Sequence, residues 1–136
     1  FVVADMLRIT DGMNIAAVGF DRWRIDILQK ELTRAGVELP LVECGQGFKD
    51  MSPALDALEG SLLNGTIRHG LHPVLTMCAA NAAVDSDPAG NRKLTKQKST
   101  GRIDGMVALA MAFAVTAKEE AEAAYHGQVV YDLNVA

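Results

Sequence analysis

Residues 96–109 read KQKSTGRIDGMVAL, a basic, glycine-containing loop that leads into a single carboxylate, Asp104. The apolar residues that follow predict a long helix from about Ile103 to Tyr125. An aspartate in a first helical turn is favoured by the helix dipole, which is one reason for Asp104. The loop supplies a second reason, because cations gathered around one carboxylate fit a site that handles phosphate and a divalent metal.

Charge is distributed unevenly along the chain. The net charge is −4, with 13 basic and 17 acidic residues, but five of the basic residues lie between Arg92 and Arg102 and no acid lies there. An acidic body with one basic strip fits a local phosphate contact and does not fit a protein that coats nucleic acid. Lys96, Lys98 and Arg102 are the candidate phosphate contacts, although charged loops are often only solvated.

Length and composition predict one globular domain over residues 1–136, in which 49% of residues are hydrophobic. The longest apolar run, Met106–Ala117, is too short for a membrane span and predicts a buried helix. Cys44 and Cys78 show no metal-type spacing, so we expect two buried thiols in a reducing compartment. The chain opens at Phe1 without a signal pattern, and we expect it to be a truncated fragment with a helical extension and tail over 118–136.

The first half of the chain predicts a strand–helix–strand unit. Residues 1–12 read as the end of a helix, and the apolar run Asn14–Phe20 as a buried strand. A helix from Arg24 to Gly36 and a strand over Leu39–Glu43 follow. Asp21 then falls at the carboxyl end of the first strand, the edge where open α/β sheets bind ligands. Its alternative role is to cap the helix that follows.

The second half predicts helices and one hairpin. Ser52-Pro53 is typical of a helix start, and that helix should stop at Asn64-Gly65. His72-Pro73 predicts a second helix to about Ala82. The turn residues 87–91 predict a short hairpin between residues 82–85 and 92–95. Gln128–Leu133 alternates weakly, which leaves a final strand or a tail that orders on contact.

Four stretches resemble one known family in order and spacing. They are GFDRWR (19–24), QGFKDMSPA (46–54), IRHGLHPVL (67–75) and KSTGRIDGMVAL (98–109). Together they look like the C-terminal nuclease domain of phage terminase large subunits, from about Val2 to Ala117. The resemblance implies an α/β, ribonuclease-H-like fold, here partial, with a βαβ core, flanking helices and the first antiparallel strands absent.

The resemblance also implies an activity. Such a domain cuts concatemeric viral double-stranded DNA during genome packaging, with Mg²⁺ or Mn²⁺ held by acids. Asp21 and Asp104 would be the catalytic metal ligands, meeting at one end of the sheet, and Lys96, Lys98 and Arg102 would contact DNA. A third, bridging acid would precede Phe1, so cleavage by this fragment alone is expected to be impaired. The terminase small subunit and the portal would be partners, in the cytoplasm of the infected or lysogenic host.

Other residues are weaker candidates for the same site. Asp85 and Asp87 can approach it from the hairpin, and Glu43 can be a minor ligand. Asp11 and Asp26 are alternative acids, but Asp26 reads as a solvated helix residue. His69 and His72 are more typical of structural loop residues than of a zinc site. Trp23 reads as core or as a cover over the site.

Two alternatives remain open at this point. One is a related resolvase-like nuclease, and the other is a non-catalytic module that binds DNA or packaging proteins. Absence of the first strands would also leave the edge of Asn14–Phe20 unpaired. We therefore expect self-association through that edge, or its coverage by Gln128–Leu133.

Overall fold

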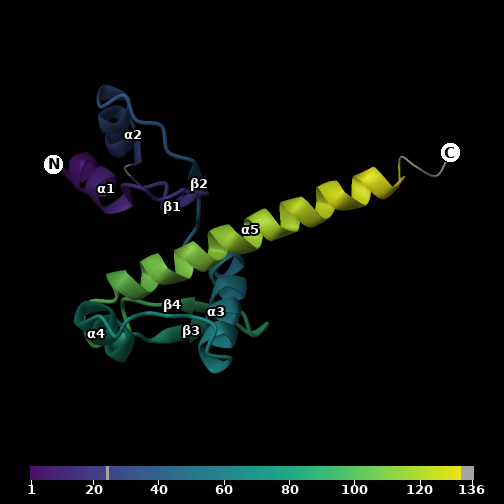
Figure 1. The fold of residues 1–136 in the computed structure, drawn as a ribbon. Coiled ribbons are helices and arrows are strands. Elements are labelled where there is room, and N and C mark those ends of the chain that lie inside the picture. Colours follow the sequence, from purple (N-terminus) through teal and green to yellow (C-terminus); the bar gives the residue numbers. More distant parts are fainter. Residues whose placement is uncertain (24, 133–136) are drawn as a thin grey trace.

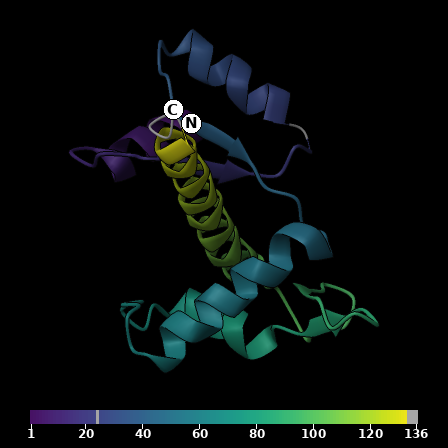
Figure 2. The same cartoon turned by 90° about the vertical axis from the view of Figure 1, so that its right-hand side faces the viewer.

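The long helix α5, Asp104–Asp132, is the central element of the fold. The computed structural model describes the backbone of residues 1–23 and 25–132, and the side chains of residues 1–23 and 25–118. Figures 1 and 2 show α1, α2, β1 and β2 on one side of α5, with α3, α4 and the β3–β4 hairpin on the other. The predicted helix is confirmed at its start, and it runs beyond Tyr125.

The first side of α5 is the predicted strand–helix–strand unit. Helix α1, Val2–Thr10, precedes strand β1, Val18–Phe20, helix α2, Ile25–Arg34, and strand β2, Leu41–Glu43. The two strands are parallel, with Val18 opposite Leu41 and Phe20 opposite Glu43. Both are shorter than predicted, because pairing begins only where the backbone N–H of Val18 reaches the carbonyl of Pro40.

Helix α3 corrects one predicted boundary. It spans Phe48–Leu63, so Pro53 lies inside the helix, and Ser52-Pro53 is not its start. The Ser52 hydroxyl is buried and accepts a hydrogen bond from the backbone N–H of Arg92. A serine that would suit a helix cap is therefore used to attach another strand. Pro53 removes one backbone donor from the helix without ending it.

The remaining elements follow the prediction. Helix α4 spans Pro73–Asn81, and strands β3, Val84–Ser86, and β4, Arg92–Leu94, form an antiparallel hairpin. The turn between the strands is held by Asp87, whose Oδ1 accepts hydrogen bonds from the backbone N–H groups of Ala89 and Asn91. Asp87 thus has a structural role in this turn.

The core lies where α3 and α5 pack together beside the end of β2. Its buried residues are Cys44, Met51, Ala54, Leu55, Ala110, Met111, Ala114 and Val115. β1 approaches α5 closely at Gly19, where an added Cβ would lie 2.9 Å from Cγ2 of Val115. Cys44 and Cys78 are both buried and free, as predicted.

A mixed α/β fold is therefore confirmed, whereas the ribonuclease-H-like class and the absent strands stay predictions. Within the described residues β1 pairs only with β2, so self-association through its other edge also remains a prediction. Residues 128–132 are helical, so a final strand there is wrong, and Leu133 lies outside the described residues. Among the described residues, none of the helices combines the length and apolar character that crossing a bilayer requires.

Candidate functional site

A polar cleft of about 620 Å³ opens at the carboxyl ends of β1 and β2. Its lining combines three acids, two cations and the glycine-rich turn that follows β2, namely Asp21, Arg22, Glu43, Gly45, Gln46, Gly47, Asp50 and Lys118. Because Phe20 pairs with Glu43, the residue after β1 and the last residue of β2 reach the same sheet edge. Asp21 therefore lies where the sequence predicted, at the ligand-binding edge of a parallel pair.

Asp21 is held by hydrogen bonds to both carboxylate oxygens. The Gln46 side-chain amide donates to Oδ2 at 2.6 Å, and the backbone N–H of Trp23 donates to Oδ1 at 3.2 Å. The second bond closes a local turn after β1. Because Trp23 precedes α2, this bond does not cap that helix, and the capping role of Asp21 stays a prediction. A carboxylate fixed in this way is pre-oriented toward the cleft.

Lys118 of α5 crosses the cleft and neutralises one of its acids. Its Nζ lies 3.2 Å from Oδ1 of Asp50 and donates a 2.7 Å hydrogen bond to the backbone carbonyl of Glu43. Asp50 fills the space over Gly45, where an added Cβ would lie 2.5 Å from its Oδ2. The Glu43 carboxylate is 4.0 Å from Arg22, a weak exposed pair. Asp50 is thus the cleft acid whose charge Lys118 balances.

Cys44 lies behind the cleft and is not a nucleophile. Burial raises the pKa of its thiol, and although Lys118 acts to lower the pKa, the nearby Asp50 and Glu43 raise it. Its Sγ faces the backbone carbonyl of Met111 at 3.9 Å. A protonated, buried thiol is a packing residue.

Asp104 occupies the first turn of α5, as predicted, with one cation in direct contact. Nζ of Lys96 donates to its Oδ1 at 2.9 Å. This hydrogen bond and the charge of Lys96, together with Arg102, lower the pKa of Asp104. The carboxylate side chain is 68% exposed, so the pair lies in solvent and contributes little to stability.

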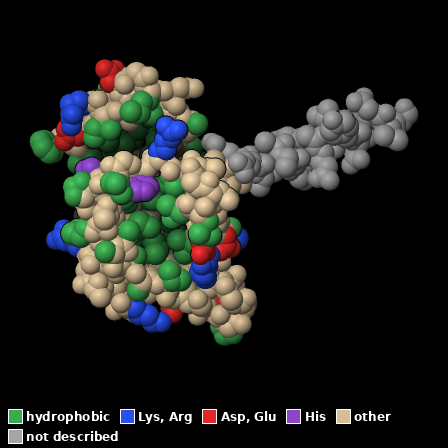
Figure 3. Space-filling view, turned by 60° about the horizontal axis from the view of Figure 1, so that its bottom comes forward, with side chains coloured by type: hydrophobic (Ala, Val, Ile, Leu, Met, Phe, Trp, Pro, Cys, Tyr) green, Lys and Arg blue, Asp and Glu red, His purple; other side chains and the backbone are tan. Residues whose placement is uncertain are grey.

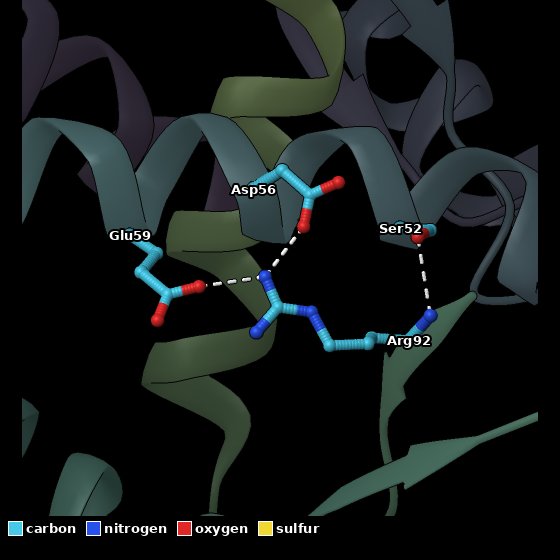
Figure 4. Close-up of polar contacts among 4 residues, drawn as sticks. All are labelled: Ser52, Asp56, Glu59 and Arg92. Atoms are coloured by element: carbon cyan, nitrogen blue, oxygen red, sulfur yellow. Dashed lines mark hydrogen bonds and ion pairs between the residues drawn. The ribbon is translucent and has the colours of Figure 1, made fainter. Parts of the chain in front are cut away.

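The other cations of the basic strip have different partners. Lys98 donates to Asp85 at 2.6 Å, which lowers the pKa of that carboxyl. The Arg92 guanidinium forms ion pairs with Asp56 and Glu59 on α3, the second at 2.7 Å. Its backbone N–H donates to the Ser52 hydroxyl (Figure 4). Arg92 therefore fastens the hairpin to α3. The predicted convergence of the whole basic strip on Asp104 is wrong, because Lys98 and Arg92 form ion pairs with other acids.

The structure does not bring Asp21 and Asp104 together. Asp104 begins α5, and Lys118, which reaches the Asp21 cleft, lies fourteen residues later in the same helix. At about 1.5 Å of rise per residue, these fourteen residues place the start of α5 roughly 20 Å along the helix from the residue that reaches the Asp21 cleft. Figure 1 shows the same relation, with the start of α5 beside α4 and its middle beside β1 and β2. The expectation that both carboxylates meet at one sheet edge is wrong for this structure.

The structure also shows where the weaker site candidates lie. Asp85 is paired with Lys98 on the hairpin, and Asp26 lies in the first turn of α2 near Lys30. His69 accepts a hydrogen bond from the backbone of Leu71, which agrees with a structural loop role. Trp23 is 81% exposed, so the core interpretation is wrong, and a cover over the site stays a prediction.

The cleft has the donor chemistry of a divalent metal site but not a complete set in this arrangement. Carboxylate oxygens are what Mg²⁺ and Mn²⁺ prefer, and Asp21, Glu43 and Asp50 supply them in one cleft. Among the residues described, no three His, Cys, Asp or Glu side chains are close enough to hold one ion. Lys118 competes with a metal ion for this cleft, because its ammonium group forms an ion pair with the Asp50 carboxylate.

Sequence reasoning missed Gln46, Asp50 and Lys118. Gln46 and Asp50 lie in one of the four stretches that resemble the family, but the sequence pattern assigns neither residue a role. The Gly-Gln-Gly break directly after β2 was the available signal, because residues following neighbouring parallel strands share one edge. No signal marked Lys118, whose position depends on how α5 packs against β1.

Known proteins resemble this chain in sequence and in structure. The sequence model of the family described as terminase large subunit, endonuclease domain, matches residues 2–120. The terminase large subunit of Enterobacteria phage HK97 is 61% identical over 111 residues, which are 82% of this chain and 22% of that protein. Protein YmfN of Escherichia coli strain K12 is 32% identical over 69 residues, 49% of this chain and 15% of that protein.

The structural comparison points the same way. The crystal structure of the HK97 bacteriophage large terminase superposes with a TM-score of 0.80 and 59% identity, over 85% of this chain and 24% of that one. The chain thus spans less than a quarter of the length of the relatives that it matches.

Proposed function

This chain belongs to the family of terminase large-subunit endonuclease domains, and on that premise we propose that it cuts concatemeric viral double-stranded DNA during genome packaging. The observation that carries the proposal is the acidic cleft at the carboxyl ends of β1 and β2. The host cytoplasm is the proposed location, and the terminase small subunit and portal are the proposed partners.

The cleft is the proposed metal site. Asp21 would be the first ligand of Mg²⁺ or Mn²⁺, because Gln46 and the Trp23 backbone already orient its carboxylate. Glu43 and Asp50 are the acids that can join it once Lys118 moves from Asp50. When bound, a divalent ion supplies Lewis-acid activation of the phosphate and of the attacking water.

DNA contact is proposed for the exposed cations. Lys96 and Lys98 are bound to carboxylates in solvent-exposed pairs, which are weak enough for a phosphate to replace them. Arg102 and, in the cleft, Arg22 add further positive charge. Phosphate contacts of this kind give affinity without sequence preference, as a domain cutting many sequences needs.

Cleavage of linear double-stranded DNA with Mn²⁺ tests the proposal. Asp21→Asn and Glu43→Gln should each lower the rate at least about tenfold, because each removes a metal ligand. Asp11→Asn, an exposed acid before β1, is the matched control and should cleave normally. Equal cleavage by the control and by both cleft variants would remove the cleft from the reaction.

A non-catalytic packaging module is the second candidate. The favouring observation is the engagement of the cleft acids by Gln46 and Lys118, without a three-acid metal group among the described side chains. A chain that binds DNA but neither binds Mn²⁺ nor cleaves under any metal condition would support this candidate. The resolvase-like alternative is not retained, because the family is established by residues 2–120.

A further inference from the structure

Lys118 is the cation of α5 that lines the polar cleft. Its ammonium group lies 3.2 Å from Oδ1 of Asp50 and donates a 2.7 Å hydrogen bond to the backbone carbonyl of Glu43. The Lys118 side chain is 42% exposed and the Asp50 side chain is 26% exposed, so solvent reaches this ion pair through the open cleft. Lys118 therefore neutralises an acid of the cleft at a place that other ions can reach.

The helix fixes where the Lys118 side chain begins but not where its ammonium group lies. The turns of α5 before Lys118 are buried in the core through Met111, Ala114 and Val115, so they hold its backbone beside the cleft. Lysine carries its charge on a flexible four-carbon stem with three rotatable donors. Its ammonium group can therefore exchange one partner for another within the cleft while α5 stays in place.

A divalent ion in the cleft would remove the present partner of Lys118. At the proposed metal site such an ion takes carboxylate oxygens as ligands, and Asp50 is one of the acids that can supply them. The ammonium group would then lie beside a doubly charged cation, and like charges at that distance repel each other. Lys118 must therefore turn from Asp50 to a different anion when the metal binds.

A phosphate of the bound DNA is the anion that fits this exchange. Lysine binds phosphate as a point charge, and the proposed substrate brings phosphates into the same cleft. Lys96 and Lys98 are likewise held by carboxylates in exposed pairs. Figure 3 shows one face of the molecule on which Lys and Arg side chains are scattered and several lie beside an acid. Exchange of a carboxylate for a phosphate is therefore the route by which such cations, Lys118 included, can contact DNA.

We propose that Lys118 is a switch that couples metal binding to DNA binding. Without a metal ion its ammonium group stays on Asp50, and with the ion bound it moves to a DNA phosphate in the cleft. This switch rests on the proposed function, because it needs a metal site and DNA in one cleft. Each ligand favours the arrangement of Lys118 in which the other binds, and such coupling between two binding equilibria is reciprocal. Mn²⁺ should thus strengthen DNA binding, and Lys118 should carry part of that effect.

Electron paramagnetic resonance of free Mn²⁺ gives the metal affinity without DNA. Lys118→Met and Lys118→Gln both remove the charge, and glutamine keeps an N–H donor for the Glu43 carbonyl. Each should bind Mn²⁺ at least about threefold more tightly than the parent chain, because the ion no longer displaces a cation. Lys118→Arg keeps the charge and should bind as the parent does. Lys30→Met, which removes an exposed lysine paired with Asp26 on α2, is the control and should also bind as the parent does.

Fluorescence anisotropy of a short labelled duplex gives the DNA affinity. The duplex carries phosphorothioate linkages, which resist cleavage. In Mn²⁺, Lys118→Met and Lys118→Gln should bind it at least about threefold more weakly than the parent, because a phosphate contact is lost. Without metal, both should bind it within about twofold of the parent, because Asp50 then engages Lys118 in the parent. Tighter metal binding with weaker DNA binding is a combination that a damaged fold does not produce.

Two results would overturn the switch. They are Mn²⁺ binding by Lys118→Met and Lys118→Gln that is no tighter than in the parent, and DNA binding in Mn²⁺ that matches the parent. If Asp21→Asn loses Mn²⁺ binding in the same titration, only the switch fails and the metal site stands. If the parent and both Lys118 variants bind no Mn²⁺, the metal site fails, and the switch fails with it.

Discussion

The separation of Asp21 from Asp104 gives the most decisive prediction. Two ions that flank one phosphate lie only about 4 Å apart, so Asp104, at the start of α5 and roughly 20 Å along the helix from the Asp21 cleft, cannot share them with Asp21. We therefore expect Asp21→Asn to weaken Mn²⁺ binding and Asp104→Asn to leave it nearly unchanged. The double variant should behave as the single Asp21 variant does.

The size of each effect follows from distance. Across about 20 Å of water, removing one charge alters the affinity for a doubly charged ion by at most about twofold. At 0.1 M salt, where the Debye length is about 10 Å, the change falls to roughly 1.1-fold. Removing the Asp21 ligand itself should cost at least about tenfold.

Electron paramagnetic resonance of free Mn²⁺ at 0.1 M salt measures these affinities. The 136-residue chain, the two single variants, the double variant and Asp11→Asn as control are titrated together. The effects of substitutions at distant sites combine additively to within about twofold in affinity, and we expect that for the double variant. A tenfold loss in Asp104→Asn, or a double variant that departs further from additivity, would show that the two carboxylates share ions and that the reasoning from α5 is wrong.

The remaining predictions concern stability. Gly19→Ala should lower stability by about 1–3 kcal/mol, because its Cβ would press on Val115 in the core, and thermal unfolding by circular dichroism should show a fall of several degrees. Gly60→Ala, with nothing within 4 Å of its Cβ inside α3, should instead gain about 1 kcal/mol in the same assay. The lowered pKa of Asp85 beside Lys98 stabilises the fold above the unfolded carboxyl pKa, and this is lost as pH falls below about 4. Between pH 6 and pH 3, the Tm of Asp85→Asn should therefore fall less than the Tm of the parent chain. An equal fall would show that the Asp85–Lys98 pair does not contribute to stability.

Much of the fold was predictable because it depends on local pattern. The α2 stripe of Leu28 and Leu32, the turn at Asp87 and the basic loop before α5 each specify an element through spacing or turn chemistry. The start of α3 was not predictable in this way. Ser52 has the side chain of a helix cap. Its hydroxyl instead accepts a hydrogen bond from the backbone N–H of Arg92, forty residues later in the chain.

The sequence by itself determined the family, the order of the elements and the place of Asp21 after a buried strand. These follow from motifs and from the two periodicities of helix and strand, which are properties of neighbouring residues. Only the tertiary structure decided what surrounds Asp21. The position of α5 along β1 is set by packing at Gly19, Met111 and Val115, and it brings Lys118 to the cleft while leaving Asp104 at the far end of a rigid helix.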